Sequence, residues 1–255
     1  MTRPTIIAIA NQKGGVGKTT TAVNLAASLA AAERPTLLCD LDPQANASSG
    51  VGQAPGTVET TIYDALIGNA TLTDIIRPTP LAALDVAPSS QDLTAVEYEL
   101  FDDAGRGTHL RTLLRDANLS KYEFVIIDSP PSLGVLTLNV LVAAHRVIVP
   151  LQPEYYALEG ITYLMATIDR VRASLNPELQ VEGIVLTMWD PRNRLAHDVA
   201  DQVRKHFRVF DAVIPRNVRL SEAPSHGLPA LLYDVGCKGA QGYLSLAREV
   251  IEGHS

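Results

Sequence analysis

Short, continuous runs of apolar and β-branched residues recur along the chain, separated by longer segments whose apolar positions repeat at helical spacing. Runs that are apolar throughout, without an alternating polar face, are typical of strands buried on both faces of a sheet. They predict strands at residues 5–10, 36–41, 84–87, 123–128, 146–151, 181–188 and 212–214.

Helical patterns fill the intervals between these runs, at residues 20–32, 61–66, 108–117, 134–144, 158–175, 195–207 and 240–252. Strands that alternate with helices predict an α/β fold with a doubly wound, mostly parallel sheet flanked by helices. In such sheets ligands bind beyond the carboxyl ends of the strands, where three glycine-rich or acidic motifs of this chain fall. The 255 residues contain no linker or internal repeat, so we expect one domain over residues 1–255.

The first of these motifs, QKGGVGKTT at residues 12–20, leaves a predicted strand and enters a predicted helix. Glycines let backbone N–H groups surround phosphate oxygens, and the helix N-terminus adds partial positive charge. A lysine at position 18 neutralises the β- and γ-phosphates, and the hydroxyl of Thr19 is a ligand for Mg²⁺. The motif predicts a P-loop that binds ATP and Mg²⁺ through Lys13, Gly14, Gly15, Val16, Gly17, Lys18, Thr19 and Thr20.

Two carboxylates stand where the second predicted strand ends, in the segment DLDPQ. Asp40 and Asp42 share one face of that strand because strand side chains alternate. This places them where the γ-phosphate of a bound nucleotide is expected. Asp40 is predicted to contact the waters around Mg²⁺ or the loop lysine.

The strand at residues 123–128 closes an apolar run on Asp128 and is followed by Ser129 and two prolines. A hydrophobic strand ending in aspartate is the form of a Walker B strand, whose carboxylate holds Mg²⁺ directly or through water. The segment at residues 130–134 is then a candidate switch that senses the γ-phosphate.

Two departures from the standard P-loop pattern point to a particular family. Gln12 replaces the first glycine of the standard loop, and a second lysine, Lys13, follows it. Together with QPEYYALEG at residues 152–160 and IPRNVRLSEAPSHG at residues 214–227, they make the whole chain resemble the ParA/Soj ATPases, which carry a deviant Walker A loop.

The resemblance implies a role for several individual residues. Lys13 would reach across a nucleotide sandwich to the phosphates held by a second subunit, so that ATP joins a homodimer. Asp42 would position the attacking water, which makes Lys13, Lys18 and Asp42 the catalytic candidates. Pro215 and Asn217 would line the adenine pocket, and Arg192 and Arg219 would bind DNA phosphates.

The resemblance also implies a function: an Mg²⁺-dependent ATPase switch whose ATP-bound dimer binds DNA non-specifically in chromosome or plasmid segregation. A ParB-like centromere-binding partner would trigger hydrolysis. We expect a cytoplasmic, nucleoid-associated protein, because no apolar run approaches a membrane span and no signal-peptide pattern precedes the first strand.

Composition limits the alternatives. The net charge is −7, but residues 186–219 carry seven basic side chains against four aspartates, which is compatible with a local basic face or an ordinary solvated surface. Two cysteines and six scattered histidines provide no disulfide framework, zinc motif or iron–sulfur cluster, which excludes a nitrogenase-type iron protein.

A MinD-like membrane-cycling ATPase in division-site placement is the alternative function. It would need a basic amphipathic tail. The predicted C-terminal helix has an apolar stripe that includes Tyr243 and Val250, but its polar face bears Glu249 and Glu252 against Arg248 alone. We therefore expect this stripe to pack in the core and expect no stable membrane association.

Overall fold

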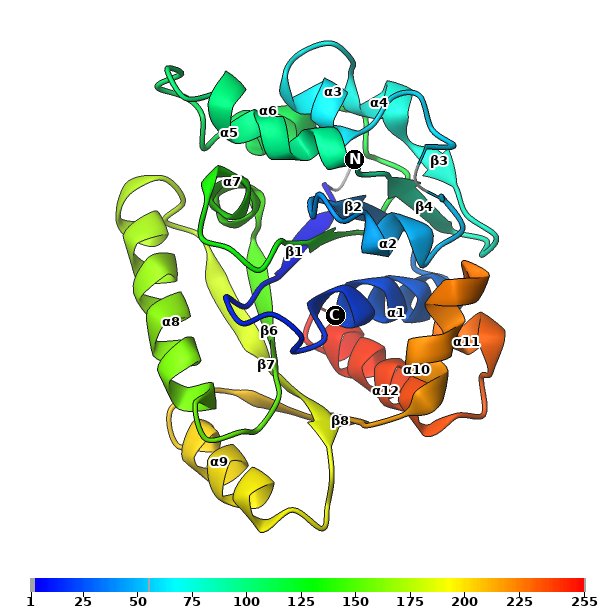
Figure 1. The fold of residues 1–255 in the computed structure, drawn as a ribbon, viewed down its shortest axis with the longest axis vertical. Helices are drawn as coiled ribbons and strands as arrows, with labels where there is room; N and C mark the ends of the chain where they lie inside the picture. Colours follow the sequence, from blue (N-terminus) through cyan, green and yellow to red (C-terminus); the bar gives the residue numbers. More distant parts are fainter. Residues whose placement is uncertain (1–2, 55, 255) are drawn as a thin grey trace.

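The computed structural model describes residues 3–54 and 56–254. Within them, eight strands form one sheet in the order β3-β4-β2-β5-β1-β6-β7-β8, with helices on both faces (Figure 1). The strands are β1 (Thr5–Ile9), β2 (Thr36–Asp40), β3 (Arg77–Pro78), β4 (Leu84–Ala87), β5 (Phe124–Asp128), β6 (Arg146–Leu151), β7 (Gln180–Trp189) and β8 (Val209–Pro215).

The predicted doubly wound, mostly parallel sheet is confirmed, and among the described pairings only β3 with β4 is antiparallel. Strand β3 was not predicted, because its two residues form no apolar run. Strand β8 begins before the predicted residues 212–214, at Val209. It is an edge strand whose burial alternates, so only part of it reads as a continuous buried run.

Each of the seven predicted helices is present, with ends shifted by a few residues. The helices are α1 (Lys18–Ala31), α2 (Asn46–Ser49), α3 (Ile62–Leu66), α4 (Leu72–Ile75), α5 (Val96–Glu99), α6 (His109–Asp116), α7 (Val135–Ala143), α8 (Ala157–Ser174), α9 (Arg194–Arg204), α10 (Val218–Glu222), α11 (Ala230–Tyr233) and α12 (Lys238–Glu252), with 3₁₀ turns η1 (Gln91–Ala95) and η2 (Ala223–His226). The unpredicted helices have four or five residues, too few to show a helical period.

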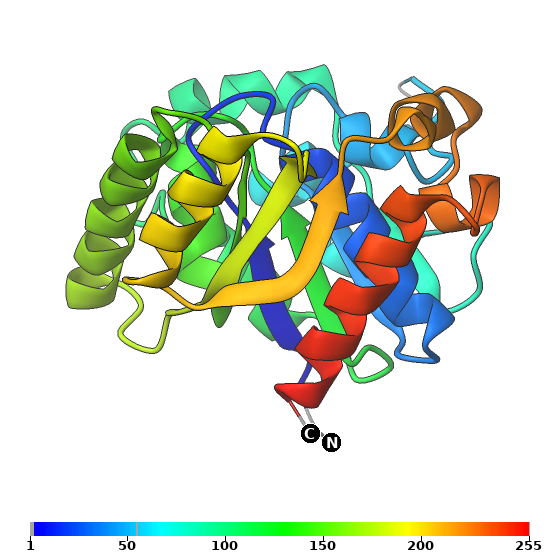
Figure 2. The same cartoon turned by 90° about the horizontal axis from the view of Figure 1, so that it is seen from below.

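Helices α1 and α12 pack side by side on one face of the sheet, whereas α7 and α8 cover the other (Figures 1 and 2). Each face has its own apolar cluster, as a sheet covered on both sides requires. The α12 residues Tyr243, Ala247 and Val250 are buried in the cluster beneath α1. The apolar stripe of this helix is therefore core packing, as expected. None of the helices in residues 3–54 and 56–254 has the length and apolar character needed to cross a bilayer.

Candidate functional site

Three neighbouring strands bring the three motifs together. Strand β5 lies between β2 and β1, and in the ladder Asp128 is opposite both Asp40 and Ile9. The loops that follow β1, β2 and β5 therefore leave the sheet at the same edge. This parallel register brings Asp128 to the two earlier motifs, although it follows both of them by more than eighty residues in the chain.

The glycine-rich loop presents backbone N–H groups at the start of α1. Gly15 and Gly17 have φ angles of 75° and 88°, which side-chain-bearing residues rarely adopt. Gly17 caps α1 without a side-chain acceptor, so the first N–H groups of this helix remain available to an anion.

Two polar side chains for which the sequence predicted no role hold this loop in place. The Thr187 hydroxyl donates to the Val16 carbonyl at 2.8 Å. Asn11 accepts from the Lys13 N–H at 3.0 Å and donates to the Pro150 carbonyl at 2.8 Å. A polar residue directly after an apolar strand was the available signal for Asn11, whereas Thr187 comes from the distant strand β7.

Lys18 is 6% exposed, and its Nζ donates to the Lys13 carbonyl at 3.1 Å. Burial lowers the pKa of its ammonium group, and the nearby Asp128 and Asp42 carboxylates offset part of this effect. The buried lysine therefore lies among the acidic groups, beside the N-terminus of α1. A phosphate bound there would bring it the negative charge that burial disfavours.

The two aspartates after β2 have different surroundings. Both oxygens of Asp40 accept hydrogen bonds, Oδ1 from the Asp42 N–H at 3.1 Å and Oδ2 from the Ser48 N–H and hydroxyl at 2.7 Å. Burial raises the pKa of Asp40 to about 6, against the effect of the Ser48 hydrogen bonds. Asp42 accepts through Oδ1 from the Gln44 N–H at 3.0 Å. Asp40 thus shapes the loop, and Asp42 keeps an oxygen that no described donor occupies.

Asp128 is fully buried, and neither of its carboxylate oxygens has a partner in hydrogen-bond geometry within the part of the chain that the structure describes. Burial, then repulsion from Asp40, raises its pKa well above the usual value, while the Thr19 hydroxyl favours the charged form. A buried carboxylate without a partner beside a hydroxyl fits a divalent cation.

Among residues 3–54 and 56–254, no group of three or more histidine, cysteine or acidic side chains could hold a metal. Mg²⁺ in nucleotide sites commonly takes one or two protein oxygens, with phosphates and waters completing its octahedral shell. Thr19 and Asp128 can supply the two protein oxygens of such a nucleotide site. They fit this kind of Mg²⁺ site better than one in which protein side chains supply every ligand.

Lys13, the second lysine of the loop, is on the surface. Its Nζ is 2.6 Å from Glu154 Oε2, and the two side chains are 42% and 47% exposed. The two lysines of one loop therefore have opposite surroundings, because Lys18 is buried whereas Lys13 is exposed and paired with Glu154.

A small cavity of about 140 Å³ adjoins the loop. It is lined by Gly17, Thr20, Thr187, Met188, Ile214, Pro215, Arg216, Asn217, Leu220, Ser221 and Tyr243. The structure therefore places Pro215 and Asn217, the residues proposed for the adenine pocket, beside the phosphate loop. Met188, for which the sequence predicted no role, has a φ of 50°, and strained backbone of this kind is often found at ligand sites.

A larger cavity, of about 690 Å³, lies at the amino edge of the sheet, away from all three motifs. The helices α6, α7 and α8 end there, and Arg111 donates to the Leu175 carbonyl at 2.7 Å at the end of α8. Arginines near helix C-termini balance the negative ends of the helix dipoles. The charged groups at the larger cavity therefore have a structural explanation, whereas the smaller cavity adjoins the P-loop.

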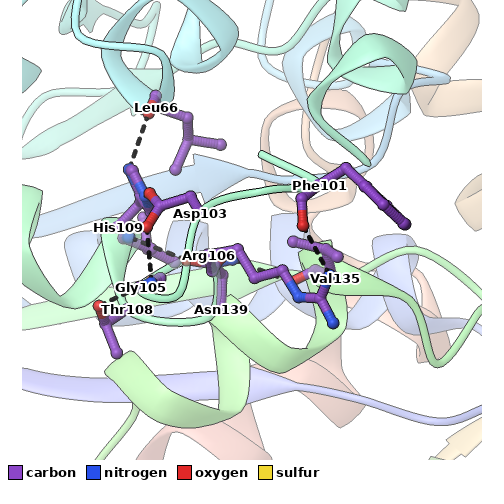
Figure 3. Close-up of polar contacts among 10 residues, drawn as sticks. Leu66, Phe101, Asp103, Gly105, Arg106, Thr108, His109, Val135 and Asn139 are labelled. Carbon is purple, nitrogen blue, oxygen red and sulfur yellow. Dashed lines mark hydrogen bonds and ion pairs between the residues drawn. The ribbon is translucent and has the colours of Figure 1, made fainter. Parts of the chain in front are cut away.

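The segment at residues 130–134, the candidate switch, leads directly into α7, which is firmly anchored. Asn139 of α7 donates to the Arg106 and Val135 carbonyls (Figure 3). Its side-chain oxygen accepts from the Leu110 N–H at 3.1 Å. The Val135 N–H also donates to Glu97 Oε1 at 3.2 Å. Leu133, by contrast, is 49% exposed. The hydrogen bonds therefore fix helix α7 itself, whereas the segment at residues 130–134 before it is exposed to solvent at Leu133.

Arg192 and Arg219, the candidate DNA-binding residues, are exposed. Arg192 is next to the start of α9, and Arg219 lies on α10. Their side chains are 88% and 50% exposed. Asn217, which lines the small cavity, also caps α10 by accepting from the Arg219 N–H at 2.9 Å. The cavity and Arg219 are therefore joined through one short helix.

Comparison with known proteins places these features in a family. Residues 4–181 match a family model described as an AAA domain. The chromosome partitioning protein ParA of Caulobacter vibrioides is 56% identical over 96% of this chain and 93% of its own. The sporulation initiation inhibitor protein Soj of Bacillus subtilis is 51% identical over 96% of this chain and 97% of its own.

A solved structure extends the comparison to bound ligands. Cobyrinic acid a,c-diamide synthase from Mycobacterium smegmatis, with bound ATP analog and magnesium, has a TM-score of 0.88 and 34% identity. The match covers 99% of this chain and 96% of that one. Its identity is well below that of the partitioning proteins, which therefore guide the functional assignment.

Proposed function

The chain belongs to the ParA/Soj family of chromosome-partitioning ATPases, and from this premise we propose that it is an ATP-dependent dimerising switch that binds DNA without sequence preference. It is an ATPase with ATP and Mg²⁺ as cofactors. Its role is in segregation. The finer proposal concerns which residues perform each step and what the ATP-bound state binds.

In this proposal the P-loop residues 13–20 hold the phosphates, and Pro215 and Asn217 hold the adenine. Support comes from the free N–H groups at the start of α1 and from the adjoining cavity. Thr19 and Asp128 would hold Mg²⁺, which supplies positive charge to the phosphate oxygens when bound.

Asp42 would orient the attacking water, since one of its oxygens is fixed by the Gln44 N–H and the other is not engaged by a described donor. Asp40 is the weaker candidate because both of its oxygens are already used. Lys18 would stabilise the charge that develops on the transferring phosphoryl group, together with Lys13 from the second subunit.

The opposite surroundings of the two lysines are the observation that carries the dimer proposal. Lys18 already occupies the site of its own chain, whereas Lys13 is exposed, and its ammonium group forms a surface ion pair with Glu154. Exposed ion pairs contribute about 0–1 kcal/mol, so a partner's phosphates can displace Glu154. The two-fold dimer would place each Lys13 on the nucleotide of the other subunit.

Arg192 and Arg219 would bind DNA phosphates, which gives affinity without sequence preference. A ParB-like partner would stimulate hydrolysis and release the dimer into monomers, so the protein would be nucleoid-associated in its ATP state. The whole chain, residues 1–255, would act as one domain in this cycle.

The decisive experiment measures DNA binding and oligomeric state with ATP, with ADP and without nucleotide, beside co-sedimentation with anionic liposomes. ATP-dependent dimers that bind any duplex and ignore liposomes support the proposal. Liposome binding without DNA binding would instead support the membrane-cycling alternative.

For the Lys13→Ala variant we expect ATP affinity within about threefold of wild type but no ATP-dependent dimer, because its charge acts across the interface. Light scattering with a non-hydrolysable ATP analogue measures this. Lys121→Ala is the matched control, since Lys121 is also exposed and paired, with Asp85 at 2.7 Å. A clear ATP-dependent dimer of Lys13→Ala would refute the assignment.

For the Arg219→Glu variant we expect weaker DNA binding on every sequence, with ATP binding and dimerisation intact. Each phosphate contact contributes about 0.9 to the slope of log K against log salt, so a dimer that loses two contacts should lose about 1.8. Arg192→Ala should act in the same direction but more weakly. Arg115→Glu, on α6 at the amino edge of the sheet, is the control. Unchanged affinity and slope in Arg219→Glu would place the basic surface elsewhere.

A further inference from the structure

Arg219 is held by two carboxylates of its own chain. Its Nη1 is 2.7 Å from Glu222 Oε2, and its Nε is 3.4 Å from Asp234 Oδ2. The Tyr233 ring lies 5.9 Å from the guanidinium carbon. The Tyr233 hydroxyl, 3.4 Å from the same Glu222 oxygen, helps to fix that carboxylate. These contacts join α10 to the end of α11, which lies beside it at the right of Figure 1.

Arg192 has the same kind of partner. Its Nε and Nη2 meet the two oxygens of Asp190 at 3.1 and 3.2 Å, a bidentate pair. Other basic residues of the stretch, Arg194, Lys205 and Arg216, have no ion pair within residues 3–54 and 56–254. Arg204 and Arg208 of the same stretch also pair with one carboxylate each, Asp201 and Glu182. Among the described residues of this stretch, Arg219 differs in having two carboxylate partners.

A carboxylate on an arginine occupies the position that a phosphate would take, since both anions accept from the same fork of N–H groups. We propose that Glu222 and Asp234 form an intramolecular mask that DNA must displace from Arg219. This inference rests on the proposed DNA-binding function and adds its regulation. The mask lowers the DNA affinity of a single subunit, so that stable binding requires the two copies of Arg219 in a dimer.

The energetics suit such a device. The three side chains are 40–50% exposed. Ion pairs with this exposure change an equilibrium constant by at most about fivefold. A DNA phosphate can therefore displace the mask. In a dimer, multivalent binding adds far more DNA affinity than the mask removes. A single subunit has no multivalent gain to offset the mask.

The experiment measures binding of a short duplex by fluorescence anisotropy, with the full chain in a non-hydrolysable ATP analogue and in ADP. The variant is Glu222→Gln/Asp234→Asn, which removes both negative charges and keeps similar side-chain shapes. Glu59→Gln/Asp102→Asn is the control, because it makes the same change in net charge at exposed positions before α3 and after α5.

Each of the two ion pairs contributes at most about fivefold, so we expect the unmasked variant to bind DNA up to about 25-fold more tightly per subunit. The gain should be larger for the ATP dimer, and binding in ADP should become measurable. The salt slope should become steeper, because fewer carboxylates oppose the phosphates. Adding Arg219→Ala should cancel the gain. If the double variant melts below wild type, each single variant should still show part of the gain.

Binding by the double variant that matches the control, or a gain that survives Arg219→Ala, would overturn the mask while leaving DNA binding by the wild type intact. If only the unmasked variant binds DNA, the mask is supported, and something besides ATP must displace it in the wild type. Failure of both proteins to bind DNA in ATP would reject the proposed function and the mask together.

Discussion

The Lys18→Ala variant is expected to lose ATP binding, and with it dimerisation, DNA binding and turnover. Lys18 is enclosed beside the N-terminus of α1, and among the described lysines it alone is buried at the loop. Removing one partner of a buried charge pair costs about 2–5 kcal/mol, which corresponds to roughly 30- to 5,000-fold in affinity. Isothermal titration with ATP and Mg²⁺ measures the loss.

The same variant should not be destabilised in the absence of nucleotide. The Lys18 ammonium makes one hydrogen bond, to the Lys13 carbonyl, and burial already disfavours its charge. Without nucleotide, the melting temperature of the variant should therefore equal or exceed that of wild type. The rise in melting temperature that ATP produces in wild type should be absent. ATP affinity within threefold of wild type would exclude Lys18 from the phosphate site.

The Asp42→Ala variant is expected to bind ATP, dimerise and accumulate on DNA, but to hydrolyse ATP about 100-fold more slowly or worse. The reason is that phosphate contacts remain while the group that orients water is lost. Single-turnover hydrolysis with DNA and the activating partner measures the chemical step. A rate within about threefold of wild type, a barrier change well below ~1.4 kcal/mol, would remove Asp42 from this role.

Asp42→Asn separates the geometry of the loop from the chemistry. It keeps an oxygen for the Gln44 N–H but lacks the negative charge, so it should also be slow. Asp40→Ala is the contrast, because Asp40 organises the backbone of Asp42 and Ser48. That variant should lower the unfolding temperature more than Asp42→Ala, because Asp40 accepts three hydrogen bonds and Asp42 accepts one, from the Gln44 N–H.

The sheet and the phosphate loop could be predicted because their signals are local. The strands of the sheet interior are buried on both faces, so β1, β2 and β5 read as continuous apolar runs. The loop needs glycine at positive φ and lysine at a fixed spacing, and both requirements are visible in nine consecutive residues. Strand β3 and the short helices gave no such signal, since a few residues cannot display a period.

The different roles of Asp40 and Asp42 were harder to predict from the sequence. Both stand on one strand face two residues apart, and the sequence distinguishes them only through resemblance. In the structure Ser48 of α2 takes up one oxygen of Asp40, while the neighbouring strand brings Asp128 opposite it. Burial and repulsion then raise the pKa of both buried carboxyl groups, an effect that depends on the packed surroundings.

The sequence by itself determined the α/β architecture, the phosphate loop and the identity of the acidic strand ends, because backbone conformation and burial impose residue types at short spacing. The tertiary structure alone decided which distant side chains meet: Thr187 with the loop carbonyl of Val16, Lys13 with Glu154, and Arg219 with Asp234. Such contacts depend on how separate strands, loops and helices are packed together and on which rotamers the packing allows. Spacing along the chain does not encode either of these.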